Sequence, residues 1–506
     1  SAGATGNTAI GVNALFSSGT PTGTTAFGWG ASYYPTGNYN VFLGYKSGYG
    51  NSSTNSAHNN VAVGKESLNS IQDGQENVAI GDQAGYNITS GDYNVAIGTD
   101  ALRSVTTALG NVGIGRYAGS ALTVDQYTVA IGSSAAQDAT TTESVIIGQN
   151  AGYSLTGDGN IAIGKNAMFA ATASADNVVI GKNALDSNNG NYNVVIGTSA
   201  AQGATTMDSS VIIGRHAAGG NVPTGDYNVA IGYQALYQLH TGAESNTSLG
   251  FRAGYSHTTG NDNTYLGANA GSGSTTATQN VAVGKDALKA AQTSSDGGQN
   301  SVLGFGAYID GTGHRNVIAG YRAAYTSTSA NSNVALGYEA GYKNTTGDSN
   351  VFIGNKAGPS STSTASNELY IHNNEGTPLI GGDFSAGTVT INGVLSATAK
   401  SFNIEHPLYK DKRLVHGSLE GPEHGIYIRG TIEASKGCEI ELPDYWQAMC
   451  EDYTVQLTPH GPYTVFIQEK HKDKVMIASS SQDYKFDYFI VGKRTDEEFE
   501  VVQDGE

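Results

Sequence analysis

The chain has 506 residues, of which only 14% are charged and 69 are glycine, and its formal net charge is −18. A typical globular domain carries about 25% charged residues and about 7% glycine, so this is not the composition of an ordinary enzyme core. The acidic balance disfavours a nucleic-acid partner, no apolar run is long enough to predict a membrane span, and two cysteines are too few for a disulfide scaffold.

The composition changes near residue 400. Residues 1–399 hold 61 glycines, with 14 Lys and Arg against 24 Asp and Glu. Residues 400–506 hold 8 glycines, with 12 Lys and Arg against 20 Asp and Glu. The chain therefore has two regions of different composition. We predict a repeat array over 1–360, a closing segment over 361–399 and a globular domain over 400–506.

The repeat array is defined by a short apolar segment that ends in glycine. This glycine recurs 21 times from Gly11 to Gly354, with a mean spacing of about 17 residues. Four residues before it stands asparagine in 17 copies, as at Asn94 and Asn228. The other four copies have Thr24, Thr128, Ser144 and Ser210. All of these side chains can hydrogen-bond to backbone at a turn, and stacked amides are expected to form a ladder.

Each column of the repeat has a structural interpretation. Residues such as Val-Ala-Ile before Gly98 and Gly232 alternate large, small, large, so one face of a strand presents Val and Ile (Ile97, for example) and the other mostly alanine. Three residues after the glycine stands alanine in 19 copies, including Ala101 and Ala235. A small residue at a fixed position predicts a corner where two backbones approach closely.

This spacing predicts a β-solenoid with one coil per repeat. At about 4.8 Å per stacked strand, the array would form a rod on the order of 100 Å long. Separate small domains of β-hairpins are the alternative, but they have no reason to keep one spacing. The strands are apolar or small on both faces, so we expect three-fold association of sister chains with the small-residue face at or near the interface. Ala96→Glu or Ala230→Glu would then disrupt the trimer.

The run N-V-A-I-G-x-x-A, at 94–101 and 228–235, resembles the head repeat of the YadA-like trimeric autotransporter adhesins. The resemblance covers about residues 7–360 and implies a left-handed parallel β-roll that assembles as a homotrimer. The repeat here is longer than the compact head repeat, which implies larger outer loops. Residues after 360 do not resemble the coiled-coil stalk or the outer-membrane anchor of those adhesins.

The rest of the chain resembles phage fibre proteins. The segments that resemble the closing part of such rolls are E-L-Y-I-H-N (368–373), T-P-L-I-G-G-D-F (377–384) and V-T-I-N-G-V-L (389–395). The segments that look like a C-terminal domain of phage and prophage tail-fibre proteins are 400–408, 414–431 and 486–494. This resemblance implies a structural protein rather than an enzyme.

The domain over 400–506 is predicted to be all-β. Strand-like runs separated by turn signals favour a small sandwich or barrel, and no helical period is evident. The runs are 425–433, 438–442, 453–457, 463–468, 475–478, 486–491 and 499–502.

Candidate chemistry in this domain is sparse. Glu420 and Glu423 flank Gly421 and Pro422, and could act as an acid–base pair or form a rigid turn with carboxylates capping backbone amides; we favour the turn. The three nearby histidines have no metal-ligand spacing: His406, His416 and His424. Cys438 and Cys450 could form a disulfide, but buried free thiols are favoured. We predict no catalytic residue, no cofactor and no metal.

Two features of the array could indicate an activity. Its acids fall mostly in turns and are interpreted as turn formers rather than as catalytic pairs: Asp92, Asp158, Asp226 and Asp348. Its loop tyrosines could stack on sugars, but packing of one coil on the next is favoured: Tyr86, Tyr153, Tyr255 and Tyr342.

Together these observations predict an extracellular virion fibre or tail-fibre protein. A homotrimeric shaft would display a terminal domain over 400–506 that contacts a host-surface glycan or protein receptor, and the fibre would join other virion proteins. The alternative role for this domain is to set the register of the trimer during assembly. No membrane insertion is expected. The alternatives are a polysaccharide-degrading tailspike and a bacterial surface adhesin.

Overall fold

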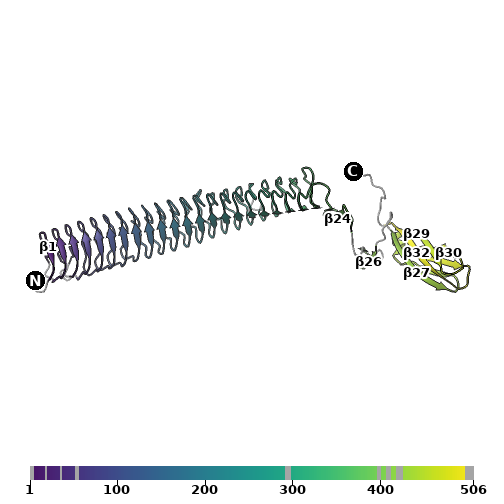
Figure 1. Ribbon diagram of the computed structural model, residues 1–506, viewed down its shortest axis with the longest axis horizontal. Helices are drawn as coiled ribbons and strands as arrows, with labels where there is room; N and C mark the ends of the chain where they lie inside the picture. Colours follow the sequence, from purple (N-terminus) through teal and green to yellow (C-terminus); the bar gives the residue numbers. More distant parts are fainter. Residues whose placement is uncertain are drawn as a thin grey trace. The chain divides into compact units, whose positions relative to one another are not determined.

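The computed structural model (Figure 1) describes residues 5–16, 20–34, 37–51, 56–290, 298–395, 401–405, 412–417 and 425–495. The chain divides into two compact units, Ser1–Gly393 and Val394–Glu506. The first is a parallel β-solenoid and the second consists of small antiparallel sheets, so the predicted all-β solenoid is confirmed. No helix in the described ranges is long and apolar enough to cross a membrane.

Each coil of the solenoid contributes one three-residue strand, and neighbouring strands pair in parallel (Figure 1). The β5–β6 pair, for example, aligns Val78 with Val95 and Ile80 with Ile97. The strands are β1 Thr8–Ile10, β2 Thr25–Phe27, β3 Val41–Leu43, β4 Val61–Val63, β5 Val78–Ile80, β6 Val95–Ile97, β7 Val112–Ile114, β8 Val129–Ile131, β9 Val145–Ile147, β10 Ile161–Ile163, β11 Val178–Ile180, β12 Val194–Ile196, β13 Val211–Ile213, β14 Val229–Ile231, β15 Thr247–Leu249, β16 Thr264–Leu266, β17 Val281–Val283, β18 Ser301–Leu303, β19 Val317–Ala319, β20 Val334–Leu336 and β21 Val351–Ile353.

The glycine after each strand is required by the backbone. Gly98 has a φ of 129°, which L side chains rarely adopt, and a Cβ there would lie 2.7 Å from the carbonyl carbon of Gly115. A Cβ on Gly232 would lie 2.4 Å from the carbonyl oxygen of Gly250. The glycine column therefore marks the line along which successive coils contact each other through bare backbone.

The asparagine column forms the predicted ladder of buried amides. The Asn94 backbone N–H and Nδ2 both donate to Oδ1 of Asn77, at 3.0 and 3.1 Å. Nδ2 also donates to the carbonyl of Ala108 at 2.9 Å, and Asn94 Oδ1 accepts from the backbone N–H of Asn111 at 3.0 Å. Thr128 joins the ladder through its backbone N–H, which donates to Asn111 Oδ1 at 2.9 Å. One amide side chain thus connects three successive coils.

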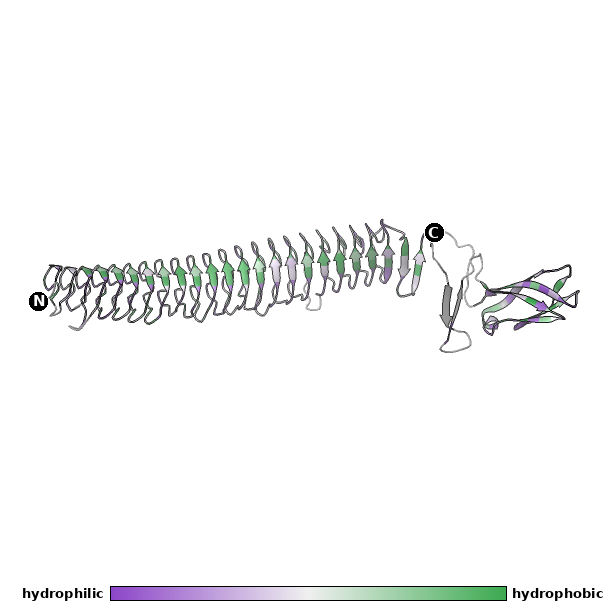
Figure 2. Cartoon of the chain, turned by 60° about the horizontal axis from the view of Figure 1, so that its bottom comes forward, coloured by the Kyte–Doolittle hydropathy of each residue, from purple (hydrophilic) through white to green (hydrophobic). Residues whose placement is uncertain are grey.

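From β2 to β21 the central residue of the strand, which is alanine in many coils, is buried in its own coil, so the predicted placement of the small-residue face at an interface between chains is wrong. Ala96 and Ala230 are 0% exposed within a single chain and share buried clusters with the corner alanines Ala101 and Ala235. The flanking Val and Ile residues are partly exposed, and hydrophobic strands follow one another along the solenoid in Figure 2. Where a large turn side chain such as Leu102 already occupies the coil interior, a small strand residue such as Ala96 fits inside.

Large and small side chains alternate between two inner columns. Ala96 at a strand centre is followed six residues later by Leu102, whereas Tyr265 is followed by Gly271. A Cβ on Gly271 would lie 2.3 Å from the Tyr265 ring. Leu102 and Gly271 share a left-handed backbone, with φ of 47° and 58°. In these coils a large residue in one column therefore stands beside a small residue in the other. Two further large–small pairs are Phe42 with Gly48 and Ile146 with Gly152.

The solenoid ends in three strands that turn away from the coil pattern. The first pairs in parallel with β21, and the next two continue the sheet as an antiparallel meander. They are β22 Glu368–Ile371, β23 Ile380–Asp383 and β24 Thr388–Ile391.

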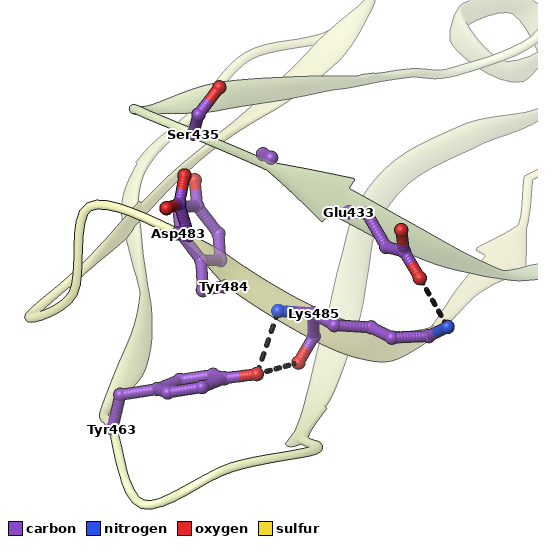
Figure 3. A pocket seen from close by; sticks show the side chains of 7 residues that line it. Glu433, Ser435, Tyr463, Asp483, Tyr484 and Lys485 are labelled. Carbon is purple, nitrogen blue, oxygen red and sulfur yellow. Dashed lines mark hydrogen bonds and ion pairs between the residues drawn. The ribbon is translucent and has the colours of Figure 1, made fainter.

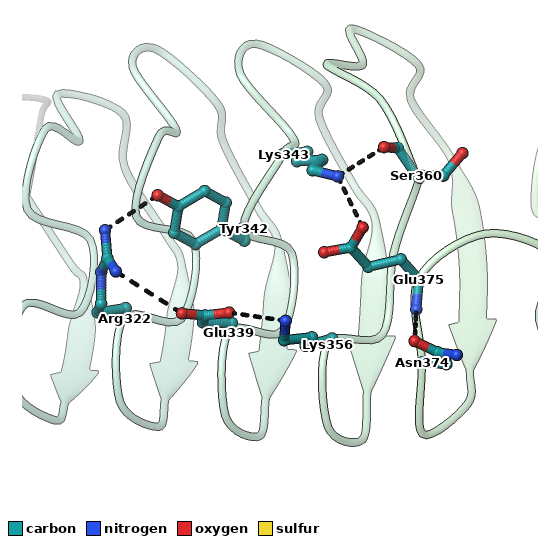
Figure 4. Close-up of polar contacts among 8 residues, drawn as sticks. All are labelled: Arg322, Glu339, Tyr342, Lys343, Lys356, Ser360, Asn374 and Glu375. Atoms are coloured by element: carbon teal, nitrogen blue, oxygen red, sulfur yellow. Dashed lines mark hydrogen bonds and ion pairs between the residues drawn. The ribbon is translucent and has the colours of Figure 1, made fainter.

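Ion pairs connect the last coils (Figure 4). Glu339 lies 3.7 Å from Arg322 and 3.6 Å from Lys356, so one carboxylate connects neighbours on both sides. Lys343 Nζ lies 2.7 Å from Glu375, in the segment between β22 and β23. This hydrogen bond lowers the pKa of Glu375 below its ordinary value. The closing segment is thereby held to the coil before it.

The second unit is a small sandwich with a separate hairpin. One sheet has the order β27-β32-β29, the other β28-β31-β30, and β25 pairs with β26. Ile426, Phe486 and Ile490 of the first sheet share one buried cluster with Val475 and Ile477 of the second. The elements are β25 Ser401–Glu405, β26 Arg413–Gly417, β27 Gly425–Ala434, β28 Cys438–Glu441, α1 Trp446–Met449, β29 Cys450–Pro459, β30 Val465–Lys470, β31 Lys474–Ser479 and β32 Tyr484–Arg494.

Six of the seven strand-like runs of this unit coincide with strands, and the run over 499–502 lies outside the described residues. The single helical turn α1 was not predicted. It buries Trp446 and Met449, three positions apart, on one side of the turn. Four residues are too few to show a helical period in the sequence.

Candidate binding surface of the C-terminal sheet

The residues that the sequence marked in the repeat lie in the framework of the solenoid. They are Asn94 and Asn228 in the ladder, Gly98 and Gly232 at the coil contacts, Ala101 and Ala235 in buried corners, and Ile97 on the outward face. The turn motif formed by Glu420, Gly421, Pro422 and Glu423 lies outside the described residues.

The turn acids serve the coils, as predicted. Asp92 Oδ1 accepts from the backbone N–H of Gln75 at 2.7 Å, in the preceding coil. Asp348 accepts from the N–H of Asn331 at the same distance. The other two bonds of this kind run from Thr142 to Asp158 and from Asp208 to Asp226.

The loop tyrosines stack on one another. Tyr237 and Tyr255 have ring centroids 5.2 Å apart and planes inclined by 11°. Tyr325 and Tyr342 are 5.4 Å apart and inclined by 4°. Packing of one coil on the next is therefore confirmed for these pairs, and the ring faces within each pair are occupied.

Other candidate groups of the C-terminal unit form no site in the described residues. Neither Cys438 nor Cys450 forms a disulfide, and Cys450 is buried. No group of three or more His, Cys, Asp or Glu side chains within the described ranges is arranged to hold a metal ion. His406 and His424 lie outside these ranges.

The outer face of the sheet β27-β32-β29 brings together side chains from three distant segments. Residues of alternate parity, such as Ile426 and Ile490, point into the core, so their neighbours point outward. The register forms one row of Arg429, Phe489 and Gln456 and a second row of Thr431, Asp487 and Thr458.

Most charges on this face are paired. Asp487 accepts from the Thr431 hydroxyl at 2.6 Å and lies 2.9 Å from His460 Nε2. These two partners, Thr431 first, lower the pKa of the Asp487 carboxyl below its ordinary value. Glu433 and Lys485 form a hydrogen-bonded ion pair, which lowers the pKa of Glu433 and raises that of Lys485.

Arg429 has no such partner. Its side chain is exposed and makes no hydrogen bond or ion pair within the described part of the chain. Beside it lies the half-buried Phe489, whose ring centroid is 5.5 Å from that of Tyr427, with the planes inclined by 36°. A hollow of about 440 Å³ opens here, and Arg429, Phe489 and Gln456 line it with their neighbours in the second row. A free cation, an aromatic ring and an amide thus meet in one shallow site.

A second hollow of about 460 Å³ lies at the end of the same sheet (Figure 3). Several of its polar groups are used within the fold. The Tyr463 hydroxyl accepts from the Lys485 N–H at 2.7 Å and donates to the Lys485 carbonyl at 2.9 Å. The Tyr484 hydroxyl donates to the carbonyl of Lys436, and burial raises the pKa of Tyr484 to about 12. This hollow therefore offers fewer free donors than the Arg429 site.

Sequence reasoning did not identify Arg429, Phe489, Gln456 or Asp487. The alternation over 425–433 and 486–491 does indicate which side chains share a face. The pairing of Arg429 with Phe489, 60 positions away, follows only from the sheet order.

Comparison of the chain with protein-family models, with curated proteins and with solved structures finds no match. Function is therefore inferred from the repeat pattern and from the geometry of the two units.

Proposed function

We propose that the chain is a structural protein of a virion fibre, whose homotrimeric shaft displays the C-terminal unit for attachment to a host surface. The observation that carries this proposal is the solenoid itself. Its coils keep one spacing over β1 to β21, and their turn acids and stacked tyrosines bind neighbouring coils. A rod on the order of 100 Å long suits reach and display.

Three-fold assembly is supported by the outward face of the strands. Two columns made mostly of Val, Ile and Leu follow this face, and the exposed fraction reaches 55% at Ile10 and 56% at Leu303. Monomeric proteins rarely expose apolar patches larger than about 300–600 Å². Sister chains that cover these columns would remove the apolar stripe from water, and cyclic symmetry would leave a closed shaft.

The fibre would act outside the cell and join further virion proteins. Its attachment partner would be a glycan or a protein of the host surface. The free side chains of the outer C-terminal face favour this unit over the shaft as the attachment site, because the shaft side chains described above contact one another.

Binding of the fluorescently labelled full chain to a panel of bacterial strains tests attachment. We expect saturable binding to at least one strain, displaced by excess unlabelled chain, without new reducing ends in that strain's purified surface polysaccharide. No saturable binding across the panel would contradict attachment. Progressive shortening of the polysaccharide would instead identify a tailspike enzyme.

A further inference from the structure

We propose that the outer face of the sheet β27-β32-β29 binds an acidic sugar, with Arg429 holding the sugar carboxylate and Phe489 packing against the sugar ring. This inference rests on the proposed attachment function, for which it names a ligand class and a site.

The charge balance of the face favours an anionic ligand. Asp487 is paired with His460, and Glu433 with Lys485. Among the described residues, the side chains of this face that keep an unpaired charge are Arg429 and Lys493, and both are positive. A guanidinium binds a carboxylate through two parallel hydrogen bonds in a fixed plane. Because Arg429 is already exposed, such a ligand need not displace an internal partner.

The neighbours of Arg429 suit a sugar ring. A pyranose has an apolar C–H surface and a rim of hydroxyl groups, so it needs an aromatic face and nearby polar groups. Phe489 supplies the ring, and Tyr427 lies beside it at a 36° inclination rather than in a parallel stack. Gln456 and Thr458 line the same hollow and can exchange hydrogen bonds with hydroxyls. A volume of about 440 Å³ accommodates a small saccharide unit.

Other polyanions fit less well. Residues 400–506 carry 12 basic against 20 acidic side chains, which disfavours the many phosphate contacts of a nucleic acid. An extended peptide that adds a strand needs an open sheet edge. Phe489 instead lies on the central strand β32, between β27 and β29. Recognition through the face of the sheet therefore favours a compact ligand.

Calorimetric titration of the full chain with trigalacturonate and with neutral galactotriose tests the site. We expect the acidic trisaccharide to bind at least tenfold more tightly. Arg429→Gln should weaken trigalacturonate binding at least tenfold, and galactotriose binding by less than twofold. Lys472→Gln is the matched control, because it removes one positive charge from an exposed turn and should change neither affinity. Phe489→Leu should weaken both ligands.

Equal binding of the two trisaccharides, or equal effects of Arg429→Gln and Lys472→Gln, would overturn the proposal. So would tighter binding of a hexaglutamate peptide than of trigalacturonate. The melting temperature of Arg429→Gln should match that of the parent, because the side chain has no internal partner among the described residues. Cell binding by the same variants separates the two proposals. If the parent and Arg429→Gln bind cells equally, the site is wrong while attachment stands; sugar binding without cell binding refutes attachment alone.

Discussion

Replacing Asn94 by alanine measures what one amide of the ladder contributes to the solenoid. The substitution removes the acceptor of the Asn111 N–H and the donor to the Ala108 carbonyl. The hydrogen bonds of the Asn94 side chain to Asn111 and Ala108 lie in the buried interior. A buried polar group left without a partner costs about 1–3 kcal/mol, so two of them predict a loss of about 2–6 kcal/mol in stability.

Amide hydrogen exchange, followed by mass spectrometry and compared with chemical denaturation, measures this loss. In Asn94→Ala, protection of backbone amides from exchange should fall most in the coils that contain Asn94 and Asn111, because the hydrogen bonds that are removed lie there. Asn94→Thr should cost less, because the hydroxyl of Thr128, at another ladder position, still donates to the carbonyl of Thr141 in the next coil at 2.7 Å. Thr99→Ala, at an exposed position of the same coil, is the control and should change little. Equal protection and equal denaturation midpoints in Asn94→Ala and the parent would refute the role assigned to the ladder.

Three further predictions test packing, ion pairing and assembly. Gly271→Leu should destabilise its coil by about 1–3 kcal/mol, because the new side chain overpacks against Tyr265. Adding Tyr265→Ala to this variant should restore much of the melting temperature, because the coil then has alanine and leucine at the two positions that Ala96 and Leu102 occupy in another coil. The pKa of Glu375 is lower in the folded than in the unfolded protein, so the unfolded protein binds more protons at this group. The stability that the Glu375 ion pair contributes is present above pH 4.5 and is lost as the pH falls through the folded-state pKa. Glu375→Gln should therefore reduce the acid sensitivity of the melting temperature, measured as a function of pH. Ile231→Lys, on the outward face, should shift sedimentation from trimer to monomer, whereas an unchanged trimer would show that this face is not the interface.

The solenoid could be predicted from the sequence because each coil repeats the same constraints. The asparagine, glycine and alanine columns each correspond to a contact that only one to three residue types satisfy. The orientation of the strand could not be predicted from its large–small alternation. Whether Ala96 or Val95 points inward depends on how much volume the corner and turn residues, such as Leu102, already occupy inside the coil.

The candidate binding site could not be predicted from the sequence in the same way. Its residues lie on strands with ordinary alternation, and nothing near Arg429 in the sequence marks that side chain as unpaired. That property follows from the partners of its neighbours: Asp487 bonds to Thr431 and His460, and Lys485 bonds to Glu433. Such pairings join residues far apart in sequence, so they emerge only when the sheet is assembled.

Because the coils are structurally equivalent, the length of the shaft is set by the number of repeats. Excision of residues 95–111 would join Asn94 to Val112 and leave the order of asparagine, strand, glycine and corner alanine intact. The shaft would shorten by one strand spacing, about 4.8 Å, while both of its ends stayed unchanged. Duplication of the same segment would lengthen the shaft by the same step. The length of the solenoid can therefore be changed by whole coils while the residues of the C-terminal unit stay the same.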